Sequence, residues 1–148
     1  MKVLLQVVKH ARCIIDNKVH SSIENGFLFF VGFNYLDNEE VMKKTIAKAC
    51  SLRLFMDSNG KTNLSLNDVG GKIMCISQFT LYADVKKGRR PSFIDAARGE
   101  ISEPLYLKTI DYIRELGYEC ETGVFGADMK IDLINDGPMT IIIDSEDL

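Results

Sequence analysis

Apolar stretches follow one another along this chain in an order that excludes a regular alternation of strands and helices. The first third is rich in β-branched and aromatic residues, and the last part is rich in β-branched residues again. Two segments with helical periodicity lie between them, around one apolar strand. Regular alternation would build a doubly wound parallel sheet. The observed order predicts an α+β fold with a mainly antiparallel, partly barrel-like sheet and two main helices, and 148 residues suit a single domain over residues 1–148.

The expected strands are marked by apolar runs and by the turn residues between them. Residues 4–10 and 11–16 form such runs, and DNK at 16–18 and ENG at 24–26 are turn sequences. FLFFVGF at 27–33 is apolar throughout, which is typical of a strand covered on both faces. Residues 72–84 predict a buried strand that runs into a loop. Two or three further strands are expected, at residues 119–124, 129–134 and 139–144.

Both expected helices show a start signal and an apolar stripe. Asp37 or Asn38 can cap the first helix, and DSNG at 57–60 ends the region that follows it. The second helix is expected to begin at Ser102, with Pro104 in its first turn, and to stop at Gly117. The residues expected to face the core are Met42, Ile46, Ala49 and Cys50 in the first helix and Tyr106, Ile110 and Ile113 in the second.

The four cysteines indicate a reducing compartment. Cys13, Cys50, Cys75 and Cys120 form no CxxC pair and lie mostly among apolar residues, so we expect buried free thiols. Neither His10 nor His20 has metal-ligand spacing to a cysteine, so we expect no metal and no other cofactor. No apolar run is long enough to span a bilayer and no signal peptide opens the sequence, which favours a cytoplasmic protein without a membrane partner.

Common catalytic motifs are absent, and one polar segment interrupts an apolar strand. The sequence contains no GxSxG, no P-loop, no HExxH and no GxGxxG before a helix. Side-chain triads are therefore not expected, and backbone amides, hydroxyls or the substrate itself are the candidate catalytic groups. The polar segment is Ser77-Gln78-Phe79-Thr80. It fits equally a strand that leaves the core and a site where hydroxyls and amides converge on a ligand.

Two further segments are ambiguous when taken alone. Lys86, Lys87, Arg89 and Arg90 crowd into VKKGRRPSF, although the net charge of the whole chain is −3. Charge alone favours a solvated loop, and a local basic patch can also steer a phosphate backbone. NDGPMT at 135–140 separates two of the expected strands. An isolated NDGP is most simply a hairpin turn, but its proline removes a backbone donor that such a turn does not need to lose.

Taken together, four segments resemble the D-aminoacyl-tRNA deacylase family over essentially the whole chain. They are LLQVVKHARCIID, SQFTLYAD, KKGRRPSF and FGADMKIDLINDGPMT, in this order. The resemblance implies a compact α+β domain that works as a homodimer. It implies that Ser77, Gln78, Phe79 and Thr80 line the active site of one subunit. Gly137 and Pro138, joined by a cis bond, would come from the other subunit.

The resemblance also implies a reaction, the hydrolysis of the ester that joins a D-amino acid to the terminal adenosine of tRNA, in chirality proofreading. Backbone N–H groups near Phe79 and Thr80 would stabilise the oxyanion, and the 2′-hydroxyl of the substrate would organise the water. Carbonyls of the Gly137-Pro138 turn would accept hydrogen bonds from the substrate ammonium group. The turn would then exclude the side chain of an L-residue but not that of a D-residue, and it could not exclude glycine.

Other roles follow from the same resemblance. Phe125 and Met129 would form the apolar pocket for the terminal adenine, or else belong to the ordinary core. Lys86, Lys87, Arg89 and Arg90 would contact the phosphates of the acceptor stem. One departure concerns Val7, because the family usually has arginine after Gln6. Two alternatives remain open: a non-catalytic module that binds RNA ends, and a hydrolase of small D-aminoacyl esters.

Overall fold

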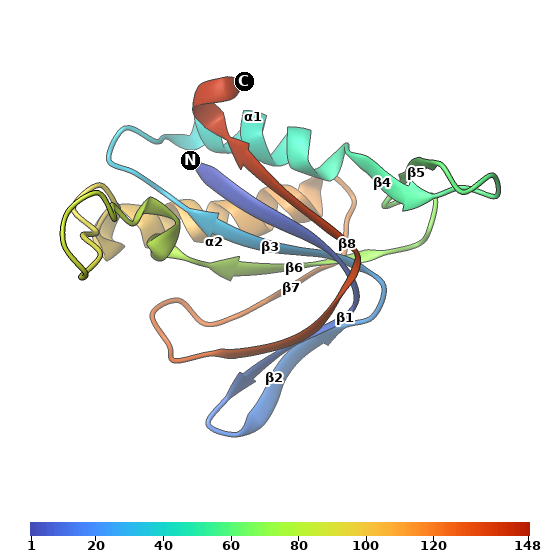
Figure 1. Ribbon diagram of the computed structural model, residues 1–148, viewed down its shortest axis with the longest axis horizontal. Coiled ribbons are helices and arrows are strands. Elements are labelled where there is room, and N and C mark those ends of the chain that lie inside the picture. Colours follow the sequence, from blue (N-terminus) through green and yellow to red (C-terminus); the bar gives the residue numbers. More distant parts are fainter.

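The computed structural model of the protein describes all 148 residues. One sheet has the strand order β2-β1-β3-β6-β7, with β8 paired to β1, and a separate hairpin joins β4 to β5 (Figure 1). The strands are β1 (Lys2–Ile15), β2 (Lys18–Ile23), β3 (Gly26–Gly32), β4 (Arg53–Met56), β5 (Thr62–Ser65), β6 (Lys72–Ser77), β7 (Cys120–Thr122) and β8 (Lys130–Asp144). The helices are α1 (Glu39–Cys50) and α2 (Gly99–Glu115), with short 3₁₀ turns η1 (Phe79–Tyr82) and η2 (Ser145–Asp147).

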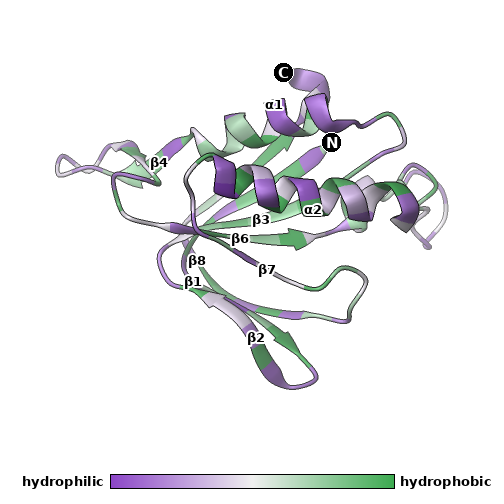
Figure 2. Ribbon diagram, turned by 180° about the vertical axis from the view of Figure 1, so that it is seen from behind, coloured by the Kyte–Doolittle hydropathy of each residue, from purple (hydrophilic) through white to green (hydrophobic).

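The sheet is mixed and strongly curled, which agrees with the predicted partly barrel-like α+β fold. β1 pairs antiparallel with β2, β3 and β8, whereas β3–β6 and β6–β7 are parallel pairs. Both helices cover one face of the sheet, while β2 and the first half of β8 curl away on the other side (Figures 1 and 2). The curl separates two apolar clusters, the larger one against the helices and the smaller one inside the bend.

Strand β3 carries side chains of both clusters. Phe27, Phe29 and Val31 belong to the larger cluster, and Leu28 belongs to the smaller one. Side chains of a strand alternate between its two faces, so this division places β3 at the centre of the core. The prediction that this strand is covered on both faces is confirmed.

The caps and stripes of the helices explain their positions. The side chain of Asn38 accepts a hydrogen bond from the Val41 N–H at 3.1 Å, so Asn38 is the cap of α1. All seven residues expected to face the core are buried. The prediction that α2 begins at Ser102 is wrong, because α2 begins at Gly99. Ser102 donates to the Arg98 carbonyl through both its N–H and its hydroxyl, which places it inside the first turn.

The end of the chain also differs from the expectation. Residues 129–134 and 139–144 are not separate strands around a hairpin, since they form the single strand β8. Both halves pair with β1, and the register passes from Gln6↔Thr140 to Val8↔Asn135. Four residues, 136–139, therefore bulge out opposite Val7. The β4–β5 hairpin around Asp57 was not anticipated either. The Asp57 carboxylate shapes its turn by accepting from the N–H groups of Asn59 and Lys61.

All four cysteines are buried and none is in a disulfide. Burial raises the pKa of the thiols of Cys50 and Cys120 to about 12, which keeps them protonated. Neither α1 nor α2 combines the length and the apolar character needed to cross a membrane.

Candidate active site

A cavity of about 430 Å³ lies where β3 and β6 end beside the start of α2. Ser77, Gln78 and Phe79 form part of its lining, and Phe125 and Met129 form another part. The structure thus brings together five of the residues selected from the sequence, from two segments far apart along the chain. Ser102, Gly99 and Asp128 also line the cavity. No local sequence pattern points to these three, because only the packing of α2 and of the 125–131 segment places them there.

The end of β6 and the start of η1 lie at the cavity. The Gln78 N–H donates to the Val31 carbonyl at 2.7 Å, which is the last bond of β6 to β3, and η1 begins at the next residue. Phe79 and Thr80 open this turn, and the opening N–H groups of a helix have no partner within it. A methyl group on Gly32 would lie 2.8 Å from the Gln78 carbonyl oxygen, so the absence of a side chain there lets the two strands approach closely.

Thr80 follows the lining residue Phe79 in η1 and is itself not part of the lining. Its hydroxyl lies 2.6 Å from the side-chain nitrogen of Gln78. An amide is not a base, so this contact orients the hydroxyl but cannot remove its proton. The cavity lining contains no histidine, cysteine or lysine, and its one carboxylate, Asp128, is paired with Lys130 at 2.7 Å. The chemistry available here is that of backbone amides and hydroxyl groups.

Phe125 and Met129 are both core and cavity residues. Phe125 packs against the larger apolar cluster, with its ring centroid 6.0 Å from that of Tyr106. Tyr106 is buried, and its hydroxyl donates to the Cys75 carbonyl at 2.8 Å behind β6. Burial raises the pKa of Tyr106 well above its usual range, so its hydroxyl stays protonated and neutral. Met129 packs against the smaller cluster, with its sulfur directly over Gly123, where a methyl group would lie 2.4 Å from it.

Gly137 and Pro138 lie in the exposed bulge of β8, and neither lines the cavity of its own chain. The peptide bond between them is cis, as the resemblance implies. Gly137 has a φ of +119°, a conformation that L-residues rarely adopt. Val7 is buried in the larger cluster beneath the bulge and offers it no polar side chain.

A side-chain network closes the base of this bulge. The Asn135 amide nitrogen donates to the Val7 carbonyl at 2.9 Å and to the Met139 carbonyl at 3.0 Å. The Asn135 amide oxygen accepts from the Thr140 hydroxyl at 3.0 Å and from the Gln6 amide at 3.4 Å. Both donors and both acceptor positions of Asn135 are in use, so one side chain fixes the two ends of residues 136–139.

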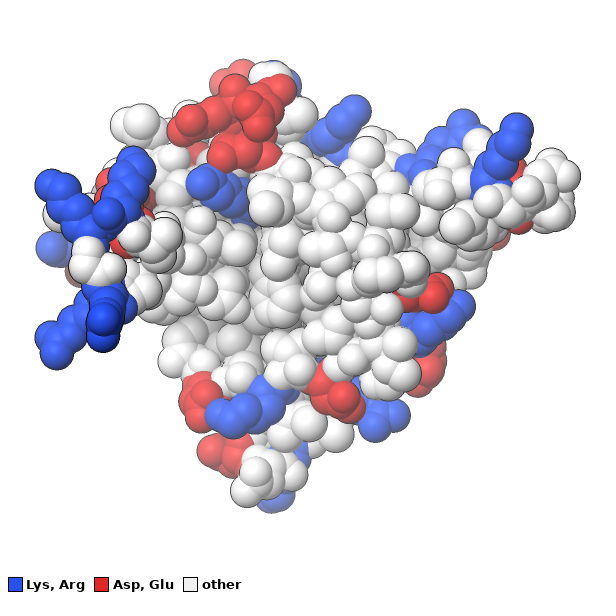
Figure 3. Space-filling model, viewed as in Figure 1, with Lys and Arg blue, Asp and Glu red and all other residues white.

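The four basic residues lie together at one end of the molecule. Asp84 and Ser92 form a two-residue bridge with hydrogen bonds of 2.8 and 2.9 Å, which closes the loop between them. The space-filling view shows the Lys and Arg side chains of this end projecting from the surface (Figure 3). Lys86, Lys87, Arg89 and Arg90 are exposed, and none of them forms an ion pair. The structure therefore leaves their charges available to an anionic partner.

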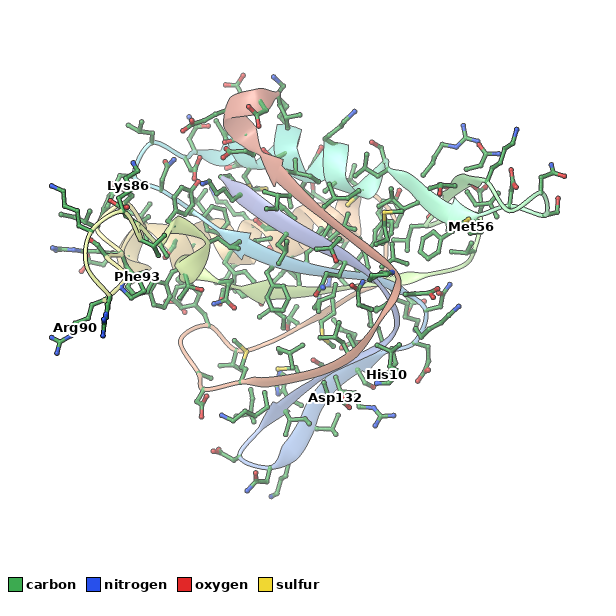
Figure 4. The ribbon with its side chains drawn as sticks, viewed as in Figure 1. His10, Met56, Lys86, Arg90, Phe93 and Asp132 are labelled. Atoms are coloured by element: carbon green, nitrogen blue, oxygen red, sulfur yellow. The ribbon has the colours of Figure 1, made fainter.

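No group of three or more histidine, cysteine, aspartate or glutamate side chains is arranged to hold a metal ion. His10 lies near Asp132, with 3.7 Å between the imidazole nitrogen and a carboxylate oxygen (Figure 4). Both residues are on the curled part of the β1–β8 pair and outside the cavity lining. They are not brought to the candidate site.

Two solved structures share the fold of this chain. A chain solved as c-Myc DNA Unwinding Element Binding Protein superposes with a TM-score of 0.91 and 32% identity, over 97% of this chain and 98% of that chain. A eukaryotic chain described as a probable D-amino acid tRNA deacylase superposes with a TM-score of 0.83 and 16% identity, over 96% of this chain and 97% of that one. The second likeness shows that the two chains share a fold.

Sequence comparison then gives the family. The chain belongs to the D-Tyr-tRNA(Tyr) deacylase family, whose model matches residues 4–144. D-aminoacyl-tRNA deacylase of Fusobacterium nucleatum is 46% identical over 99% of this chain and 97% of the relative. The enzyme of the same name from Lactobacillus acidophilus is 49% identical over 97% of this chain and 99% of the relative.

Proposed function

We propose that this protein is a D-aminoacyl-tRNA deacylase that proofreads chirality in translation, acting in the cytoplasm. It would hydrolyse the ester between a D-amino acid and the terminal adenosine of tRNA. The observation that carries the proposal is the cavity, where Ser77, Gln78 and Phe79 meet Phe125 and Met129 in a chain of this family. The proposed reaction needs no cofactor, because hydrolysis consumes only water.

The backbone at the start of η1 supplies the catalytic groups in this proposal. Water attacks the ester carbonyl, and the N–H groups of Phe79 and Thr80 stabilise the negative charge on its oxygen. One such donor is typically worth about 3–4 kcal/mol of barrier. The ester C–O bond then breaks, and the leaving ribose oxygen takes up a proton. The 2′-hydroxyl of the substrate holds the attacking water, since the only carboxylate of the cavity lining, Asp128, is already paired with Lys130.

Thr80 has a positioning role in this scheme. Its hydroxyl contacts the Gln78 amide and no group that could accept its proton. A threonine without a base is a poor nucleophile, so a covalent intermediate on Thr80 is disfavoured. The test compares Thr80→Ala with a substrate that lacks the 2′-hydroxyl. The scheme expects the modified substrate to lose more activity than the variant, and the reverse order would assign the chemistry to Thr80.

The terminal adenine and the acceptor stem use two different surfaces. The ring of Phe125 and the sulfur of Met129 line the cavity and provide an apolar surface for the adenine base. Lys86, Lys87, Arg89 and Arg90 are exposed and carry no ion pairs, so they are free to contact the phosphates of the stem. Phosphate contacts of this kind add affinity and register without reading sequence.

A homodimer completes the site in this proposal. Gly137 and Pro138 are exposed and outside the cavity of their own chain, so the turn reaches a cavity only when it comes from a second copy. β8 pairs with β1 along one edge and has no strand partner along the other, and two of its apolar residues, Ile134 and Ile142, are exposed. An open strand edge with apolar side chains favours association.

The Gly137-Pro138 turn of the partner would select the D-configuration. Main-chain carbonyls of the turn accept hydrogen bonds from the substrate ammonium group and thereby fix the α-carbon. The side chain of a D-residue then points to water, whereas that of an L-residue meets the turn. Glycine has no side chain to exclude, so glycyl-tRNA is also a substrate in this scheme.

Four substrates test the proposal. D-tyrosyl-tRNA and glycyl-tRNA should be cleaved, while L-tyrosyl-tRNA and a small ester of free D-tyrosine should react much more slowly. Cleavage of the small ester at the rate of the tRNA would indicate a general D-ester hydrolase. Binding of tRNA without cleavage of any substrate would indicate a module that only binds RNA ends.

A further inference from the structure

Two half-exposed aromatic rings lie between the cavity and the basic loop. Phe79 lines the cavity, and Phe93 directly follows the Asp84–Ser92 bridge that closes the loop. Their ring centroids are 5.1 Å apart and their planes cross at 71°, which is an edge-to-face contact. Phe93 lies at the same end of the molecule as the charged groups of Lys86 and Arg90 (Figure 4). The aromatic pair thus connects the two surfaces assigned to RNA.

Much of each ring faces water. The exposed fraction is 55% for Phe79 and 37% for Phe93, and the neighbouring Val85 and Ile94 are more exposed still. The edge-to-face contact fixes the rings relative to one another without covering them. A fixed, exposed apolar surface with a polar rim is typical of an interaction site.

The charges around this surface indicate which partner it fits. The loop between Asp84 and Ser92, which Phe93 follows, carries four cations without ion pairs, on a protein whose net charge is −3. A partner must therefore bring negative charge and flat apolar faces together. Unpaired nucleotides do this, since their phosphates contact lysine and arginine while their bases stack on aromatic rings.

We infer that Phe93, held against Phe79, is a stacking subsite for an unpaired base of the RNA end. The inference rests on the proposed function, in which the terminal adenosine enters the cavity and stem phosphates contact the basic loop. The nucleotides that join these two points must pass the aromatic pair. The subsite therefore takes a base that precedes the terminal adenosine, and it recognises the face of that base and not its hydrogen-bonding edge.

The experiment compares Phe93→Leu, which keeps apolar volume but removes the ring, with the control Phe93→Tyr, which keeps the ring. Each protein is assayed with D-tyrosyl-tRNA and with D-tyrosyl-adenosine, which has no preceding nucleotide. Binding of uncharged tRNA is measured in parallel by fluorescence anisotropy at several salt concentrations. The binding measurement tests the subsite even if no deacylation is observed. Failure of the proposed function can therefore be distinguished from failure of the inference.

Phe93→Leu should weaken tRNA binding at least about fivefold, because base stacking on an aromatic ring has an effect of this size or larger. It should lower kcat/KM on D-tyrosyl-tRNA by a similar factor and leave D-tyrosyl-adenosine unchanged, with the salt dependence of binding unaltered. Phe93→Tyr should behave like the wild type. Three results would each overturn the subsite: unchanged tRNA binding, equal losses on both substrates, or a change of oligomeric state in Phe93→Leu.

Discussion

The side-chain amide of Asn135 donates a hydrogen bond of 3.0 Å to the backbone carbonyl of Met139 and so spans the base of the β8 bulge. The same nitrogen reaches the Val7 carbonyl of the neighbouring strand at 2.9 Å. Residues 136–139, which include Gly137 and Pro138, are therefore anchored to β1 by one side chain. At the position where the sequence resemblance led us to expect arginine, this chain has the buried Val7. The polar support of the turn comes from Asn135 instead.

Asn135→Asp should loosen the turn without emptying the space that Asn135 fills. The carboxylate cannot donate to the two carbonyls, so these partly buried acceptors lose their partner at a cost of about 1–3 kcal/mol in the free energy of unfolding. A looser turn discriminates less, so the ratio of D-tyrosyl-tRNA to L-tyrosyl-tRNA cleavage should fall about tenfold or more. Urea titration and paired kinetic assays measure the two effects.

Asn67→Asp is the matched control, because Asn67 is an exposed turn residue before Gly70 and its side chain makes no hydrogen bond. It should change neither stability nor the D-to-L ratio measurably. If Asn135→Asp lowered stability but kept the full D-to-L ratio, Asn135 would be a purely structural residue.

Gly123→Ala should change the shape of the proposed adenine pocket, because Gly123 packs against Met129. The added methyl group would lie 2.4 Å from the Met129 sulfur, so this flexible side chain, which belongs to the cavity lining, must move and change the shape of the cavity. We expect KM for D-tyrosyl-tRNA to rise several-fold while kcat changes little, because the oxyanion donors at Phe79 and Thr80 are untouched. Steady-state kinetics checks this split. A fall in kcat with unchanged KM would place Met129 away from the bound adenosine.

The basic loop should control affinity and leave stereochemistry alone. Replacing Lys86, Lys87, Arg89 and Arg90 one at a time by glutamine should reduce the slope of log K against log salt by about 1 for each phosphate that is no longer neutralised. The D-to-L ratio should stay constant. Lys18→Gln, an exposed lysine on β2 without an ion pair, is the control and should leave the slope unchanged. A slope that no loop variant alters would leave these residues as an ordinary solvated loop.

Glu39 links α1 to α2 and makes stability depend on acid pH. Hydrogen bonds from Lys108 and then from Lys43 lower the pKa of Glu39 from 4.5 to about 2. A folded-state pKa below the unfolded value gives stability that is complete above about pH 4.5 and is lost as pH falls toward 2. Glu39→Gln should therefore remove part of the acid-induced loss of stability in this window, as measured by thermal unfolding at a series of pH values. Because the carboxylate is accessible to solvent, salt should reduce the difference.

Local signals in the sequence were enough for the cap of α1, the apolar stripes of both helices and the strand covered on both faces. Asn38 caps α1 as its position predicts, and the apolar stripes of both helices are buried. The continuous apolar character of residues 27–33 indicated the central strand. These features depend on residues a few positions apart, so periodicity and capping reveal them.

Features that depend on residues far apart in the sequence could not be predicted from such local patterns. The halves of β8 read as two strands because proline and glycine separate them, and only their common partner β1, at the opposite end of the chain, makes them one. The parallel pairing of β3 with β6 likewise has no local signature. Asp128 and Ser102 reach the cavity through the packing of their segments, whereas Ser77 and Gln78 stand out because they are polar at the end of an apolar strand.

Mixed dimers test the central claim, that each site combines the cavity of one subunit with the Gly137-Pro138 turn of the other. Ala127→Trp fills the cavity, since Ala127 is part of its lining. Gly137→Val disrupts the turn, because valine is strained at a φ of +119° and its side chain meets Met139. Each variant alone should be inactive on D-tyrosyl-tRNA.

Refolding the two variants together in equal amounts should restore about a quarter of the wild-type activity, because half of the dimers are mixed and each mixed dimer has one intact site. Recovery near that level would mean that the turn acts across the dimer. Absence of any recovery, with mixed dimers present by mass spectrometry, would contradict the account.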